Sequence, residues 1–545
     1  MSLLNQTVGE VVKEWTQKNP DKEAYVYPEH GIRKTYREFD QETDELAKAF
    51  IGMGIKKGEH VAIWSDNKPQ WLLSQFATGK MGAVLVTVNT NYQANELEYL
   101  LKQSDATTLI VDEGFKGTSY IDIIRSICPE LNDKEDGFVT SQRLPKLKRI
   151  ILMTDKQEAG IYKWSEFLAH ADGITDDELK KRQQSMTADD VINIQYTSGT
   201  TGFPKGVMLT HHNIVNNGKI IGDFMKLTNE DRVCIPVPFF HCFGCVLGNL
   251  AAVTHGATMV IVEQFDPLRV LQAVQDEKCT ALHGVPTMFI SELNHPDFKK
   301  YDTSSLRTGI MAGSTCPIEV MKRVISDMGA HEITICYGQT ECSPVITQTQ
   351  TDDPIEKRVS TVGKPHPYVE VKIIDPMTGE EVPVGEPGEL CTRGYHVMKG
   401  YYNNEEATRE AIDEKGWLRT GDIAVMDEDG YIDITGRIKD VIIRGGENIY
   451  PREVEEFLYT HPAVLDVQIV GVPDEKYGEE VMAWIIPKKG AAIDEESIRS
   501  FCKGQISHLK IPRFIHFVEE YPMTASGKIQ KFKLREMSVE EVVSR

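Results

Sequence analysis

The chain has 545 residues, more than one hydrophobic core usually supports, so we expect at least two domains. Apolar residues make up 41% and charged residues 26% of the sequence, as in ordinary soluble globular proteins. The formal net charge of −22 argues against nucleic acid or an anionic membrane as a partner, because a phosphate surface would repel it.

The sequence contains no segment that predicts membrane insertion or export. The most apolar stretch, 248–262, is too short to cross a bilayer. Residues 1–14 lack a basic start followed by an apolar run, which argues against a secretory signal or a transit peptide. Ten cysteines without framework spacing are typical of reduced thiols. We therefore predict a cytoplasmic protein without a membrane span.

Alternating strand and helix patterns dominate the first two thirds of the chain. This alternation predicts α/β architecture, with parallel sheets covered on both faces by helices. Strands are predicted over 60–64, 83–88, 107–111, 280–283, 306–311 and 332–337, and helices over 69–81, 95–102, 286–293 and 317–328.

The pattern changes after residue 362. Short strands broken by Gly and Pro over 362–393 predict a small β-rich unit. The last hundred residues have helices and strands of their own and predict a separate domain, with its boundary at 437–440. Its elements are a strand–turn–strand over 430–446, helices over 451–459 and 495–506, and strands over 465–470, 481–486 and 514–518.

The segment Y-T-S-G-T-T-G-F-P-K-G, 196–206, follows an apolar strand-like run and predicts a phosphate-binding loop. Its glycines let the backbone approach a polyphosphate, its N–H groups can form an anion-binding nest, and its lysine adds a positive charge. The alternative is an exposed Ser/Thr/Gly turn. The segment is not a G-x-x-x-x-G-K-[ST] loop. The candidate ligands are Thr197, Ser198, Gly199, Thr200, Thr201, Gly202 and Lys205.

Four shorter motifs follow: Y-G-Q-T-E (337–341), T-G-D (420–422), G-R-I-K-D (436–440) and T-A-S-G-K-I-Q-K (524–531). The first directly follows a predicted strand, where ligands collect in parallel sheets; its Tyr can cover a purine and its Glu can hold Mg²⁺. Taken singly, each also reads as a turn, a helix cap or a surface lysine. The pair Cys242 and Cys245, spaced C-x-x-C, predicts two small buried side chains rather than a zinc or redox site.

In order and spacing these motifs resemble the adenylate-forming superfamily of acyl-CoA synthetases, peptide-synthetase adenylation domains and beetle luciferases. The resemblance runs from about residue 36 to residue 533. The segments V-N-T-N-Y-Q-A-N-E-L-E-Y-L-L, Y-G-Q-T-E-C-S-P-V, I-I-R-G-G-E-N-I-Y-P and F-C-K-G-Q-I-S-H-L-K-I-P look most like the medium-chain fatty-acyl-CoA synthetases.

The resemblance implies a large N-terminal domain, 1–436, of two doubly wound subdomains plus a β-barrel-like unit. It also implies a hinge at 437–440 and a small mobile α+β domain over 441–545. By position, Thr197 to Lys205 would cover the ATP phosphates. The other implied roles are these: Gly313, Ser314, Thr315 and Tyr337 enclose the adenine; Thr340 contacts the α-phosphate; Glu341 binds Mg²⁺; Asp422 and Arg437 hold the ribose; Lys439 is the hinge; Gly446 borders the pantetheine arm; Lys528 is the adenylation lysine; and His241 lines the acyl-to-thiol passage.

The implied reaction is activation of a carboxylic acid, expected to be a medium-chain fatty acid, by ATP and Mg²⁺, followed by transfer to coenzyme A. Attack on the α-phosphorus turns the carboxylate oxygen into part of AMP, a good leaving group, so catalysis needs positioning and electrostatics. The alternatives are an adenylation enzyme that loads a carrier-protein thiol, luciferase-type oxygenation, and an inactive nucleotide-binding protein. Acyl chain length and oligomeric state stay open.

Overall fold

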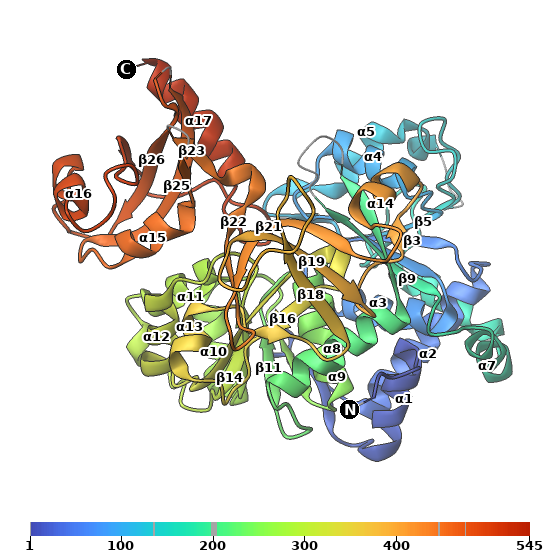
Figure 1. The fold of residues 1–545 in the computed structure, drawn as a ribbon. Helices are drawn as coiled ribbons and strands as arrows, with labels where there is room; N and C mark the ends of the chain where they lie inside the picture. Colours follow the sequence, from blue (N-terminus) through green and yellow to red (C-terminus); the bar gives the residue numbers. More distant parts are fainter. Residues whose placement is uncertain (1, 134–136, 198–203, 445–446, 475, 545) are drawn as a thin grey trace.

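The computed structural model describes residues 2–133, 137–197, 204–444, 447–474 and 476–544 (Figure 1). A large body made from the first part of the chain carries a smaller C-terminal unit at its upper edge. The α/β architecture predicted from the sequence is confirmed, with a large N-terminal domain and a small C-terminal one.

The first large sheet has the strand order β20-β10-β9-β4-β3-β5-β8. Strands β9, β4, β3, β5 and β8 are parallel, and β10 and β20 are added antiparallel at one edge. The strands are β3 (His60–Trp64), β4 (Val84–Thr87), β5 (Thr108–Val111), β8 (Arg149–Leu152), β9 (Val191–Thr197), β10 (Lys205–Thr210) and β20 (Gly400–Tyr401).

The second large sheet has the order β17-β16-β15-β14-β13-β11-β12-β1-β2. Its core from β15 to β1 is parallel, and β11 lies between β12 and β13, so the chain changes direction across the sheet at β11. The strands are β1 (Glu23–Tyr27), β2 (Ile32–Thr35), β11 (Arg232–Ile235), β12 (Thr258–Ile261), β13 (Ala281–Gly284), β14 (Thr308–Met311), β15 (Glu332–Gly338), β16 (Val345–Gln348) and β17 (Lys364–Pro365).

Helices cover both sheets. Helix α3 is buried on nearly every side because it packs between α1, α2 and the first sheet, and the polar groups that it buries have partners, such as the Lys80 ammonium, which donates to Asp44 at 2.7 Å. The helices are α1 (Val8–Lys18), α2 (Tyr36–Gly52), α3 (Pro69–Met81), α4 (Ala94–Gln103), α5 (Tyr120–Ile127), α6 (Trp164–Leu168), α7 (Asp176–Gln184), α8 (His211–Phe224), α9 (Ala251–Thr254), α10 (Pro267–Glu277), α11 (Pro286–Leu293), α12 (Ile318–Asp327) and α13 (Ile355–Ser360).

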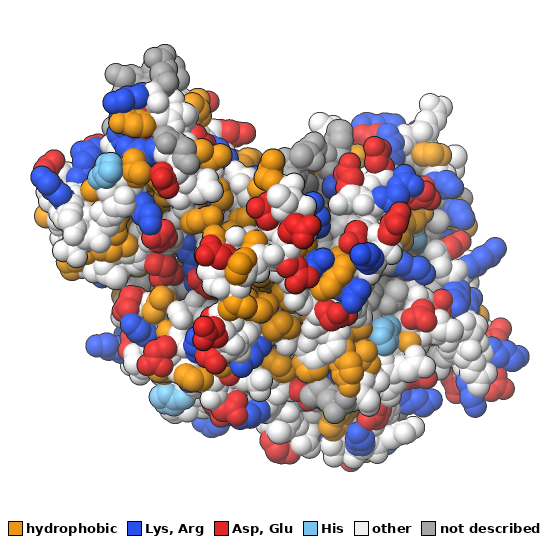
Figure 2. All heavy atoms as spheres, in the orientation of Figure 1, with side chains coloured by type: hydrophobic (Ala, Val, Ile, Leu, Met, Phe, Trp, Pro, Cys, Tyr) orange, Lys and Arg blue, Asp and Glu red, His pale blue; other side chains and the backbone are white. Residues whose placement is uncertain are grey.

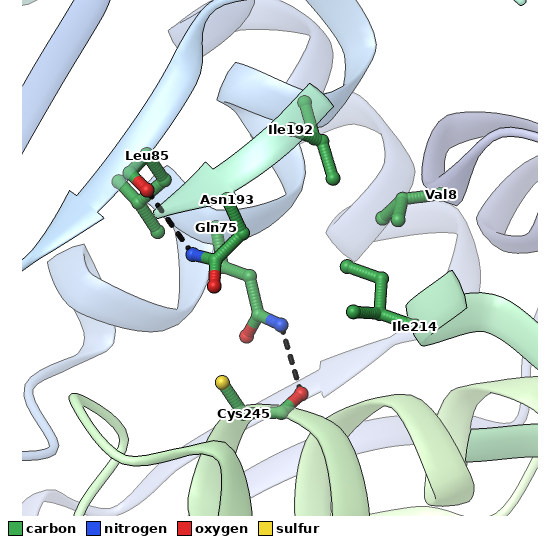
Figure 3. A pocket seen from close by; sticks show the side chains of 7 residues that line it. All are labelled: Val8, Gln75, Leu85, Ile192, Asn193, Ile214 and Cys245. Carbon is green, nitrogen blue, oxygen red and sulfur yellow. Dashed lines mark hydrogen bonds between the residues drawn. The ribbon is translucent and has the colours of Figure 1, made fainter. Parts of the chain in front are cut away.

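A π-helix, Phe243–Leu250, packs where the two large sheets meet. Behind it lies a cavity of about 10 Å³, room for about one water, between Val8, Leu85 and Cys245 (Figure 3). The Gln75 amide donates to the carbonyl of Cys245 at 2.9 Å across this cavity. The cavity is too small for a substrate, and it shows how closely the two sheets are packed.

The β-rich unit predicted over 362–393 is a four-stranded antiparallel sheet of order β18-β19-β21-β22, which extends beyond the predicted range. Within the residues that the structure describes, the sheet runs from edge strand β18 to edge strand β22. These two strands do not pair with each other, so the sheet is open. Its elements are β18 (Val369–Ile374), β19 (Gly388–Gly394), β21 (Leu418–Met426), β22 (Ile432–Arg437) and helix α14 (Glu405–Ala411).

The C-terminal unit has its own sheet, order β24-β23-β26-β25 with β27 beside β26, and its own apolar core around Val467, Ala483 and Ile498. Its elements are β23 (Ile442–Arg444), β24 (Glu447–Ile449), β25 (Val464–Asp474), β26 (Gly478–Pro487), β27 (Phe514–Phe517), α15 (Pro451–Tyr459), α16 (Glu495–Cys502) and α17 (Lys531–Ser544).

The predicted elements are confirmed as to type, with two corrections. The helix predicted over 495–506 ends at Cys502, because the next residue, Lys503, has an extended backbone with a ψ of 122°. Several helices outside the predicted ranges, among them α1, α2, α8, α10 and α17, were not predicted. No described helix is long and apolar enough to cross a membrane. All ten cysteines are free and buried, including Cys242 and Cys245.

Four buried histidines make stability depend on pH. Burial lowers the pKa of two of them to about 4 and of the other two to about 3: His211 and His283, and His366 and His396. The unfolded chain therefore binds more protons below pH 6.5, and stability falls as pH decreases, by roughly 1.4 kcal/mol per pH unit for each histidine. Burial raises the pKa of Asp66 and Asp466 to about 6, and these two oppose the trend below that pH.

We expect the urea midpoint of unfolding to decrease from pH 7.5 to pH 5, because the four histidines outweigh the buried carboxyls whose pKa is raised, such as Asp66, Asp466 and Glu292. Urea titrations followed by tryptophan fluorescence at four pH values measure this. A midpoint that is the same at pH 7.5 and pH 5 would show that these histidines are not buried in neutral form.

Candidate active site

The candidate residues gather at the carboxyl ends of the strands of the second sheet. His241 follows β11, where the strand order reverses, Gly313 follows β14, and Tyr337 lies near the end of β15. Ligands of open parallel sheets bind in the crevice at such a reversal point. On the visible side of the molecule, hydrophobic side chains gather on the large domain beside the small domain (Figure 2).

Lys528 of the small domain contacts His241 of the large domain, with 3.3 Å between Nζ and Nε2. The N–H of Phe243 donates to Nδ1 of the histidine at 3.1 Å, which directs Nε2 toward the lysine. Burial lowers the pKa of both groups; the positive charge of Lys528 lowers the pKa of His241 further, and that of Arg437 lowers the pKa of Lys528. An anion bound between them would raise the pKa of Lys528 again, because an opposite charge favours the ammonium form.

Two hydrogen bonds hold the loop that presents Lys528, one within the loop and one to the large domain. Within the loop, the N–H of Lys528 donates to Oγ1 of Thr524 at 3.0 Å. Against the large domain, Oγ1 of Thr287 donates to the carbonyl of Gly527 at 2.9 Å. The domain contact therefore depends on backbone as well as on the lysine side chain.

Gly313 packs against this lysine. It adopts a φ of 93°, and an added Cβ would lie 3.1 Å from Cε of Lys528 and 3.1 Å from Val285. Ser314 and Thr315 are exposed beside it. Because β14 and β15 are neighbouring parallel strands, Gly313 and Tyr337 emerge at the same edge of the sheet.

Tyr337, Asp422 and Arg437 form one cluster. The tyrosine hydroxyl donates to Oδ2 of Asp422 at 2.6 Å, and Nε of Arg437 lies 3.2 Å from Oδ1. Strands β21 and β22 pair Asp422 with Arg437 directly. Burial raises the pKa of Asp422, and the guanidinium opposes this rise. The cluster unites Tyr337 with two residues that lie 85 and 100 positions further along the sequence.

Thr340 and Glu341 follow β15 in a 3-10 turn, Thr340–Cys342. Oγ1 of Thr340 lies 3.8 Å from the thiol of Cys242, which also lies 3.7 Å from Nδ1 of His241. Cys242 is thus part of the site, although the sequence singled it out only as a buried thiol. Oε1 of Glu341 accepts a hydrogen bond of 2.8 Å from the hydroxyl of Tyr401.

The predicted phosphate loop connects β9 to β10. Thr197 ends β9 and pairs with Lys205, which begins β10. The ammonium of Lys205 lies over the ring of Tyr401, 4.8 Å from its centroid. Five of the predicted ligands, Ser198, Gly199, Thr200, Thr201 and Gly202, lie outside the described residues, as does Gly446.

Lys439 lies in a 3-10 turn, Ile438–Asp440, between β22 and β23. The side chain of Lys439 is exposed overall. Partial desolvation of its amine lowers its pKa, and the positive charge of the nearby Arg437 lowers it further. Its carbonyl accepts a hydrogen bond of 3.1 Å from Arg535 of α17. The turn is the last segment of the large domain's β-rich unit before the small domain's sheet.

Comparison with known proteins identifies the family. The model for AMP-binding enzymes matches residues 12–402, and the model for the AMP-binding enzyme C-terminal domain matches 453–528. The chain belongs to the AMP-binding enzyme family. It is an enzyme of the acyl-CoA synthetase class, because its relatives are named acyl-CoA synthetase or ligase and the family model matches most of the chain.

Two relatives and one solved structure place the chain within this family. YngI of Bacillus subtilis (strain 168), named provisionally as an acyl-CoA synthetase, is 60% identical over 99% of this chain and 98% of its own length. The medium-chain acyl-CoA ligase ACSF2, mitochondrial, of Danio rerio is 44% identical over 99% of this chain and 89% of its own. The anthranilate CoA ligase AuaEII, solved with anthranoyl-AMP, has a TM-score of 0.85 at 27% identity and covers 100% of this chain and 99% of its own.

Gly313→Ala tests whether the lysine position matters to this AMP-binding enzyme. The new Cβ would displace Lys528, so we expect adenylate formation to fall by roughly tenfold or more, because misplacing a reacting group is costly. Gly379→Ala is the matched control, since Gly379 has a φ of 75° and nothing within 4 Å of its added Cβ. Both variants carry the same backbone strain. Equal activity of the two variants in pyrophosphate exchange would contradict the assignment.

Proposed function

We propose that the chain activates a medium-chain fatty acid as an acyl-adenylate, releases pyrophosphate, and transfers the acyl group to coenzyme A. The Lys528–His241 contact carries the proposal, because it brings a cation of the small domain to the reversal point of the large sheet. The name of ACSF2 supports a medium-chain acid.

Lys528 would act in the first half-reaction. It lies where the acid and the α-phosphate must meet, between His241 and Gly313. Charge shifts from the carboxylate to the phosphate as the adenylate forms, and a cation already held in a partly dry site stabilises that charge without reorganisation. No covalent intermediate with the protein is needed, so the lysine acts by position and charge.

Glu341 and the phosphate loop would hold the polyphosphate and Mg²⁺. The carboxylate of Glu341 is fixed through one oxygen by Tyr401, and carboxylate oxygen suits a hard cation that keeps most of its other ligands as water and phosphate. Bound there, Mg²⁺ would neutralise charge on the departing pyrophosphate. Lys205, with Thr197 and the loop between them, would contact the phosphates.

The nucleoside would occupy the edge formed by β14, β15 and β21. The Asp422 carboxylate can accept the ribose hydroxyls and Arg437 favours its ionised form, while Tyr337 and 313–315 would enclose the adenine. Thr340 would donate to the α-phosphate. The hydrogen-bonded cluster of Tyr337 and Asp422 holds the carboxylate in place before the nucleotide binds, which reduces the entropic cost of binding.

The second half-reaction requires the small domain to move. The coenzyme A thiol must reach the same carbonyl carbon that Lys528 approaches, so the lysine has to leave. We infer that 437–440 is the hinge between a domain over 1–436 and a domain over 441–545, with Lys439 as its pivot, and that Gly446 and His241 then border the thiol passage.

Lys528→Ala should lower adenylate formation by roughly 10²-fold or more, the scale for one preorganised electrostatic contact at a transition state. It should spare thioester formation from supplied acyl-adenylate. Lys533→Ala, which removes an exposed lysine of the same segment, should leave both rates unchanged. Pyrophosphate exchange and single-turnover transfer measure the two steps. Equal losses in both would refute the assignment.

Lys439→Pro should impair coenzyme A transfer by roughly tenfold or more while adenylate formation persists, because proline fixes φ near −65° and restricts rotation at the turn. Lys439→Ala removes the same side chain without that restriction and is the control. Both half-reactions are measured on protein of unchanged thermal stability. Wild-type transfer by the folded proline variant would place the hinge elsewhere.

A further inference from the structure

Tyr401 touches two residues of the proposed phosphate and metal site. Its hydroxyl donates to Oε1 of Glu341 at 2.8 Å, and the ammonium of Lys205 lies over its ring at 4.8 Å. Only 7% of Tyr401 is exposed. No motif of the sequence pointed to this residue.

The backbone holds Tyr401 firmly in this place. Strand β20 pairs with β10, with Tyr401 opposite Val207, and the N–H of Tyr401 donates to Oγ1 of Thr408 at 2.9 Å. On the other side, the N–H of Met398 donates to the carbonyl of Glu341 at 2.8 Å. The segment around β20 is therefore attached both to the strand that carries Lys205 and to the turn that carries Glu341.

The tyrosine lies between two opposite charges. A lysine and a glutamate that face each other in a partly buried site attract strongly, and an ion pair between them would neutralise both. The Lys205 ammonium instead rests on the electron-rich face of the ring, and the Glu341 carboxylate binds the hydroxyl at its edge. Each charge is held in place and stays open toward a ligand.

We propose that Tyr401 is a positioning residue that fixes Glu341 for Mg²⁺ and keeps Lys205 apart from it, free for the polyphosphate. This inference rests on the proposed function of Glu341 as the metal ligand. The ring and the hydroxyl have separable tasks: the ring separates the two charges, and the hydroxyl orients the carboxylate.

Tyr401→Phe keeps the ring and removes the hydroxyl. We expect the Mg²⁺ concentration that gives half of the maximal thermal shift to rise by roughly tenfold to a hundredfold, the scale for losing a hydrogen bond to a charged group. Affinity for ATP without metal should stay unchanged. Tyr401→Leu removes both the ring and the hydroxyl, so Lys205 and Glu341 can form an ion pair. In this variant the Mg²⁺ midpoint should rise and the affinity for ATP without metal should fall.

The readout is ligand binding rather than turnover. The thermal shift produced by a non-hydrolysable ATP analogue is titrated with Mg²⁺, since a ligand that binds only the folded protein raises its stability. Tyr402→Phe is the matched control: its hydroxyl donates to Asp105 at 3.1 Å, away from Glu341, so the Mg²⁺ midpoint should stay at the wild-type value.

Glu341→Gln separates failure of this inference from failure of the proposed function. If Glu341→Gln raises the Mg²⁺ midpoint and Tyr401→Phe does not, the positioning role is wrong while the metal ligand stands. If Glu341→Gln itself leaves the midpoint unchanged, the metal assignment is wrong. Combining Tyr401→Phe with Glu341→Gln should add nothing to Glu341→Gln alone, because the hydroxyl acts through that carboxylate. Additive effects would overturn the inference.

Discussion

One contact between domains organises the site: the Lys528 amine beside the His241 imidazole. A cation at the carboxyl ends of the parallel strands is useful for adenylate formation only if it is held there before the substrate arrives. The large domain supplies the histidine, the Gly313 surface and Thr287, and the small domain supplies the lysine on a hydrogen-bonded loop. The enclosure that lowers the pKa of the lysine also makes the site receptive to an anion.

The remaining parts of the site depend on strand pairing. The order of the second sheet places His241, Gly313 and Tyr337 on one edge, and the β21–β22 pairing adds Asp422 and Arg437 to it. The added antiparallel strand β20 carries Tyr401 to the end of the phosphate loop. A site assembled from so many segments stays in place because each segment is anchored by backbone hydrogen bonds in a sheet.

The sequence predicted much of this because its signals are local. Helix α3 and strand β3 have the predicted bounds, since a Pro at the helix start and a short apolar strand are recognised within a few residues. The motif residues were found through their resemblance to a family. Tyr401 and Cys242 were missed because their roles come from contacts with residues about 60 and 98 positions away, which no local pattern encodes. Helix α17 was missed because its hydrophobic residues show little helical periodicity.

The central claim is that the contact between Lys528 and His241 forms for adenylation and breaks for thiol transfer. Spin labels at Glu410→Cys on α14 and Ser500→Cys on α16, both exposed, report the separation of the two domains, and the native cysteines are buried. The measurement compares the distance distribution with acid and a non-hydrolysable ATP analogue to that with an acyl-adenylate analogue and coenzyme A. The account predicts two different distances. A single distribution, unchanged by coenzyme A, would contradict it.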